Sequence, residues 1–76
     1  MKSVNIVLNS IDKVKGFVHV ISHVEGDFDL STDRYVVDAK SIMGIFSLDL
    51  SKTLRLDIHS DEIANDVLPL LGEYIV

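Results

Sequence analysis

Apolar residues recur at every second position in four short segments of this chain, and this period constrains the fold more than any other feature. The segments cover residues 4–8, 28–32, 35–39 and 54–58. In the last of them, Leu54, Leu56 and Ile58 alternate with charged side chains. A two-residue period is typical of a strand that buries one face. We therefore expect four strands in a sheet covered on one side only, with the middle two forming a hairpin around Asp33 and Arg34.

Helical spacing separates these strands. Between the first two strands the apolar residues stand three and four positions apart and form one stripe of a helix: Val14, Phe17, Val18 and Ile21. Ser10 is placed to cap this helix and Gly26 to end it. Ser41 is placed to cap a short helix that runs to about Ser47, and Ser60 to cap the last helix. The short helix is expected to lie at the edge of the molecule and to expose part of its surface.

The last helix contains a proline, which interrupts its pattern. Its expected buried stripe is Ile63, Val67, Leu70, Leu71 and Tyr74. Pro69 lacks a backbone donor and clashes with the preceding turn, so a kink or break is expected near 66–68. The element order is then βαββαβα, an α+β fold in which the first and last helices cover one face of a four-stranded sheet. A chain of 76 residues is expected to form a single domain over residues 1–76.

Composition excludes several classes of function. The chain has 7 Lys and Arg against 12 Asp and Glu, for a net charge of −5, so phosphate backbones and anionic lipid surfaces are poor partners. It has no cysteine, which excludes disulfides, thiolate metal sites and a thiol nucleophile. We expect a cytoplasmic protein that neither inserts into membranes nor carries a cofactor.

The most specific string is Lys40-Ser41-Ile42-Met43-Gly44-Ile45-Phe46-Ser47-Leu48. It resembles the regulatory-serine segment of HPr, the histidine-containing phosphocarrier of the bacterial sugar phosphotransferase system. The resemblance extends over nearly the whole chain. It implies the open-faced β-sandwich of that family, with three helices on one face of a four-stranded antiparallel sheet.

In that family, the phosphoryl-acceptor histidine at the start of the first helix is followed two positions later by arginine and then by proline. This motif is absent here. Alignment through the helix stripe places Ser10 and Asp12 at the histidine and arginine positions, whereas alignment through the first strand places Lys13 and Lys15 there. Neither a serine nor an ammonium group is a nucleophile like a neutral imidazole, and Asp12 repels phosphate. The resemblance therefore predicts neither an enzyme nor the usual phosphocarrier.

Relatives of the Crh type also lack the acceptor histidine but keep the regulatory serine, and Ser41 matches that serine. The resemblance implies phosphorylation of Ser41 by the HPr kinase/phosphorylase and binding of the product to a transcription regulator such as CcpA. Ile42, Met43 and Phe46 are then partner-binding residues, together with His19 on the first helix. Two simpler interpretations stay open. Ser41 alone is a sufficient helix cap, and Met43 and Phe46 at three-residue spacing are often core residues.

Three further functional alternatives remain. His19 can act as a substitute phosphoryl acceptor, in a protein that works with the enzymes of the phosphotransferase system. His19 and His23 at i and i+4 also have the spacing of zinc ligands, but no third ligand accompanies them, so a solvent-facing pair without metal is favoured. In the last alternative, the chain is a structural relic that binds a paralogue or forms a homodimer. His59 is expected to be a solvated residue before the Ser60 cap.

Overall fold

The computed structural model describes all 76 residues. Its elements in chain order are β1 (Lys2–Ile6), α1 (Ile11–Ser22), β2 (Phe28–Ser31), β3 (Val36–Asp38), α2 (Ile42–Phe46), β4 (Leu54–Ile58), α3 (Asp61–Val67) and the 3₁₀ helix η1 (Leu68–Leu71). The order is the predicted βαββαβα, so the α+β fold class is confirmed. None of the helices has the length and apolar character that crossing a membrane requires.

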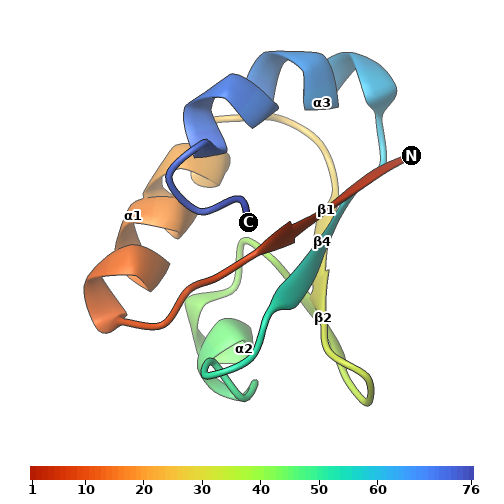
Figure 1. Cartoon of the computed structure of the whole chain (residues 1–76). Helices are drawn as coiled ribbons and strands as arrows, with labels where there is room; N and C mark the ends of the chain where they lie inside the picture. The colour runs from red at the N-terminus through yellow and green to blue at the C-terminus, as the bar shows by residue number, and fades with distance from the viewer.

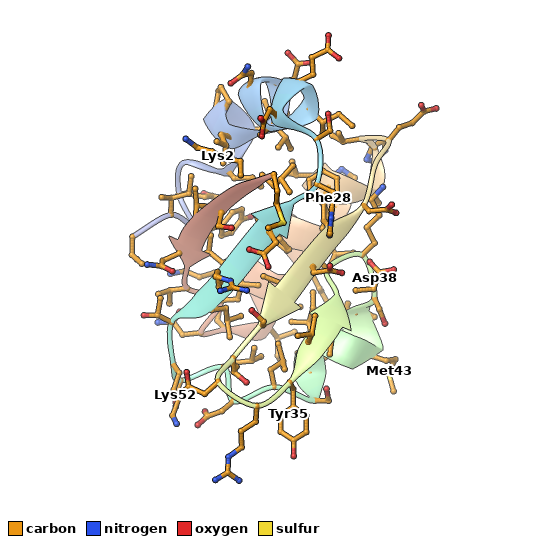
Figure 2. The ribbon with its side chains drawn as sticks, turned by 90° about the vertical axis from the view of Figure 1, so that its right-hand side faces the viewer. Lys2, Phe28, Tyr35, Asp38, Met43 and Lys52 are labelled. Carbon is orange, nitrogen blue, oxygen red and sulfur yellow. The ribbon has the colours of Figure 1, made fainter.

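The four strands form one antiparallel sheet in the order β1-β4-β2-β3. Leu56 of β4 lies opposite Val4 on one side and Leu30 on the other, so the two central strands carry the middle of the core. Figure 1 shows the sheet nearly edge-on, with α1 and α3 on one side of it. Figure 2 shows the other face of the sheet, which no helix covers. The predicted one-sided cover is confirmed.

One hydrophobic cluster fills the space between the sheet and the helices. Its 17 buried members include Leu54, Leu56 and Ile58, which are all fully buried as the alternation in β4 predicts. From α1 they include Val14, Phe17 and Ile21. The helix face and the sheet face that the sequence predicted are therefore the two surfaces that meet.

Gly26 does not end the first helix, contrary to the prediction. α1 ends at Ser22, and His23 is its C-cap with right-handed dihedral angles. The N–H groups of His23 and Val24 bind carbonyls three residues back, which tightens the last turn and satisfies the helix end without glycine. Gly26 instead adopts a φ of 125°, a value that L side chains rarely reach, and turns the chain into β2.

The break at Pro69 is confirmed, but one member of the predicted stripe is wrong. α-Helical geometry stops at Val67, and Leu68–Leu71 form a 3₁₀ turn with proline at its start. Val67 and Leu71 are buried, whereas Leu70 is 58% exposed. A 3₁₀ turn has three residues instead of 3.6, so it rotates the later side chains away from a stripe drawn for an α-helix.

The C-terminal residues close against β1. Val7 N–H donates to the Tyr74 carbonyl (2.9 Å), and Val76 N–H donates to the Asn5 carbonyl (3.0 Å). The Tyr74 ring packs edge-on against Phe17, with ring centroids 5.8 Å apart. Figure 1 shows the C-terminus beside β1. The tail thus covers part of a strand edge that would otherwise expose unpaired backbone groups.

Candidate regulatory serine site

Ser41 is the N-cap of α2, as predicted. Its backbone is extended (φ −94°, ψ 106°), and its Oγ accepts a hydrogen bond from the Gly44 N–H at 3.1 Å. Ser47 caps the other end, so the helix spans the predicted residues. The Ser41 side chain is half-buried rather than enclosed. The residue that caps the helix is therefore only partly covered by its neighbours.

α2 is amphipathic over its few residues. Ile45 is fully buried, and Leu48, just after the helix, is 6% exposed. On the other side Met43 is 79% exposed and Phe46 is 43% exposed. Figure 2 shows Met43 projecting away from the sheet beside the β3 edge. Met43 and Phe46 are therefore not core residues, and they form an exposed apolar surface two and five positions after Ser41.

Gly44 keeps the space beside that hydroxyl free. A Cβ added at Gly44 would lie 3.2 Å from Ser41 Oγ and 3.2 Å from Val37 Cβ, which is tighter than ordinary van der Waals contact. α2 therefore packs closely on β3 at this position, and a residue with a side chain would crowd the cap. This gives a structural reason for glycine three residues after the serine.

Lys40, which precedes the serine in sequence, points to a different part of the molecule. Its Nζ donates to the Val24 carbonyl at 2.5 Å and lies 5.3 Å from the centroid of the Phe28 ring. The chain enters α2 through Asp38, whose carboxylate accepts from the Lys40 N–H at 2.9 Å and whose carbonyl accepts from the Ser41 N–H at 3.0 Å. The lysine ammonium thus anchors the segment and does not pair with the serine.

The start of α1 holds the residues at which the sequence places the lost acceptor motif. Ser10 is the N-cap, and its Oγ accepts from the Lys13 N–H at 3.1 Å. Asp12 lies in the first turn, and it is exposed together with Lys13 and Lys15. The helix start therefore presents a capping hydroxyl, a carboxylate and two ammonium groups, none of which is an imidazole.

His19 is an exposed residue in the last turn of α1. Its ring contacts that of His23, with centroids 4.8 Å apart, and His23 Nδ1 lies 2.7 Å from the His19 carbonyl oxygen. His19 lies eight positions after Ile11, which is a rise of about 12 Å along the helix. The structure has no cluster of three or more His, Asp, Glu or Cys side chains arranged to hold a metal ion.

Sequence reasoning missed a pair of polar groups on the open face of the sheet. His59 is exposed, as predicted, and its Nε2 lies 2.7 Å from Asp29 Oδ2, a partner that the sequence does not indicate. The two residues are far apart in sequence, and only the pairing of β2 with β4 brings them together. Asp57 is nearly buried on the same face, where it accepts from Ser3 Oγ at 2.6 Å and from Arg55 at 3.1 Å.

Comparison with known proteins gives one informative match. No protein-family model and no curated protein matches the chain. Among solved structures, the crystal structure of HPr-C-His from Thermoanaerobacter tengcongensis is similar, with 28% sequence identity and a TM-score of 0.74. The alignment covers 95% of this chain and 92% of that one. The chain thus has an HPr-like fold, and the likeness to HPr, a phosphocarrier rather than an enzyme, agrees with the non-enzymatic role that the sequence predicts.

Proposed function

We propose that this chain, an HPr-like protein of the phosphotransferase system, is a single regulatory domain over residues 1–76 that binds protein partners under the control of Ser41 phosphorylation. The observation that carries the proposal is the arrangement at α2. The half-buried Ser41 caps the start of this helix, two positions before the exposed Met43 and five positions before the exposed Phe46.

Phosphorylation at this position changes the surface more than the fold. A phosphate adds a charge of about −1.5 to −2 at neutral pH and brings further acceptor oxygens. Because Ser41 Oγ already accepts from the Gly44 N–H, a phosphate oxygen can take over this donor with little movement of the backbone. The new charge stands beside Met43 and Phe46, so it alters which partner surface fits against them.

The start of α1 supports a role without phosphoryl transfer at the usual position. A serine hydroxyl at Ser10 is a weaker nucleophile than the neutral imidazole that accepts phosphoryl, and the Asp12 carboxylate in the first turn repels an incoming phosphate. His19 is exposed, but it lies in the last turn of α1, far from the free N–H groups of the helix start. We therefore rank carriage of phosphoryl by His19 below the regulatory role.

The partners follow from the same proposal. Ser41 is the acceptor for the HPr kinase/phosphorylase, and the phosphorylated surface at Ile42, Met43 and Phe46 binds a transcription regulator of the CcpA type in the cytoplasm. His19 of α1 belongs to the proposed partner-binding residues as well, and α1 and α2 are in contact.

Incubation with HPr kinase and ATP, followed by mass spectrometry of the proteolysed chain, tests the first step. The expected result is one phosphate, on the peptide that contains Ser41. Ser10 and Ser60 are internal controls, because both are also N-caps with the same kind of bond. A product without phosphate on Ser41, or with equal phosphate on all three caps, refutes the proposal.

The second step is tested with the phosphorylated protein and purified CcpA. Met43→Gln and Phe46→Ser are expected to weaken binding while leaving phosphorylation of Ser41 intact. Incubation with the phosphoenolpyruvate-dependent donor enzyme separates the carrier alternative. Acid-labile phosphate on His19 under those conditions would replace the regulatory proposal with phosphoryl transfer.

A further inference from the structure

A polar depression lies at one end of the open sheet face. It has a volume of about 800 Å³ and is bordered by the hairpin turn 32–36 and by parts of the loop 47–53. Asn5, Ser31 and Arg55 from the sheet complete it. Figure 2 shows Tyr35 and Lys52, which belong to its two borders, at the same end of the sheet. Three stretches of sequence that are far apart in the chain therefore build one concave surface.

This depression gathers positive charge on an acidic protein. Arg34, Lys52 and Arg55, three of the chain's 7 cationic side chains, line it. The ion pairs of the molecule involve neither Arg34 nor Lys52. The third cation is held in place, since Arg55 Nε lies 3.1 Å from Asp57 Oδ1 and a terminal nitrogen lies 3.1 Å from Asp57 Oδ2. The surface thus offers two cations that form no ion pair, beside a guanidinium paired with Asp57, and the charge of Lys52 also acts on the nearby Asp49.

Two carboxylates, those of Asp33 and Asp49, also line the depression, and they oppose its positive charge to different degrees. Asp49 Oδ1 accepts from Ser51 Oγ at 2.6 Å and from the Ser51 N–H at 3.1 Å. These bonds lower the pKa of Asp49 and commit its carboxylate to its own loop. Asp33 is exposed at the tip of the hairpin turn and is the acidic group that opposes an anionic ligand most directly.

The shape and polarity of the depression identify the kind of occupant. Only 2 of its 12 lining residues are hydrophobic. Sites for small molecules are usually enclosed and mainly apolar, so this wide polar surface suits a hydrated chain segment better. Charge complementarity then selects an acidic segment, because a basic one would meet Arg34 and Lys52.

We propose that this end of the open sheet face is a docking site for an acidic segment of a protein partner, with Arg34 and Lys52 as its principal contacts. The site is distinct from Ser41 and Met43, which lie on α2, and it does not depend on phosphorylation. A partner that uses both surfaces gains affinity by contacting two separate places on one small protein.

Titration of the ¹⁵N-labelled protein with a short peptide of alternating glutamate and glycine tests the proposal by NMR. The expected shifts are confined to amides of the turn 32–36 and the loop 47–53, and they diminish as salt is added. A matched peptide of lysine and glycine should leave these amides unchanged. Absence of shifts with the glutamate peptide, or shifts spread over the lysines of α1, overturns the proposal.

Two variants of equal charge sharpen the test. Arg34→Glu combined with Lys52→Glu is expected to weaken binding about tenfold. Lys2→Glu combined with Lys13→Glu changes the net charge equally but alters residues outside the depression, so it should retain most of the affinity. Asp33→Asn should tighten binding. Equal weakening in the two double variants would show that only overall charge matters and would refute the site.

Two further outcomes are decisive. If Arg34→Glu with Lys52→Glu fails to fold, as its NMR spectrum would show, Lys52→Gln alone replaces it, and unchanged affinity in that variant counts against the proposal. Inorganic phosphate is the second probe. If it produces the same shifts at the same concentration as the peptide, the depression binds small anions and is not a docking site for a protein segment.

Discussion

Replacing Ser41 with alanine separates the structural role of this hydroxyl from its proposed regulatory role. The substitution removes the acceptor of the Gly44 N–H and leaves that donor at the start of α2 without its partner. An N-cap serine contributes about 1 kcal/mol to the free energy of unfolding. For a domain of this size, a loss of about 1 kcal/mol lowers Tm by roughly 4–8 °C.

Ser41→Asp should leave the stability nearly unchanged, even though it adds a negative charge. Aspartate caps helices about as well as serine, so its free energy of unfolding is expected to stay within about 0.5 kcal/mol of the wild-type value. Ser10→Ala is the matched control, because Ser10 Oγ makes the same bond at the same distance of 3.1 Å on α1. Its loss should be similar to that of Ser41→Ala.

Urea denaturation followed by circular dichroism measures these differences. The slope m should be the same for all variants, so that shifts of the midpoint report stability alone. An unchanged midpoint for Ser41→Ala would refute the cap. A loss in Ser41→Asp as large as that in Ser41→Ala would refute the claim that the site accepts negative charge without cost to the fold.

Three other predictions follow from burial, backbone conformation and ionisation. Met43→Gln should change the free energy of unfolding by less than about 0.5 kcal/mol, whereas Ile45→Ala on the buried side of α2 should lower it by about 2–5 kcal/mol, both from urea denaturation. Gly26→Ala should cost about 1–3 kcal/mol in the same assay, because φ is 125° and the added methyl group would lie 2.7 Å from a side chain of α3. Burial and the adjacent glutamate raise the pKa of Tyr74 to about 12 from 10.0, so the stability that its neutral phenol carries is complete below pH 10 and is lost as pH rises through about 12. Ultraviolet absorbance titration of Tyr35→Phe should show this late ionisation, and an apparent pKa near 10 in the folded variant would contradict it.

Much of the architecture was predictable because it depends on neighbours along the chain. Alternation identified the buried face of β4, and the serine caps at Ser10, Ser41 and Ser60 were each placed correctly. The break after Val67 follows from the missing N–H and the ring of Pro69. These features are short-range, so residue type and spacing are sufficient to predict them.

The errors arose where local geometry responds to its surroundings. Leu70 fits the stripe of an ideal α-helix, but the 3₁₀ turn that proline begins rotates it to the surface. Gly26 was interpreted as the end of α1, whereas the helix closes by itself at His23 and the positive φ serves the approach to β2. A periodic pattern identifies the element but not the exact residue at which its geometry changes.

The amino-acid sequence alone determined the element types, the caps and the one-sided sheet, since each depends on residues within a few positions. Only the tertiary structure decided that His59 meets Asp29 and that Arg34, Lys52 and Arg55 line one depression. Those groups are brought together by the strand order β1-β4-β2-β3 and its register. Strand register is a long-range property, and the spacing of residues within any one segment does not contain it.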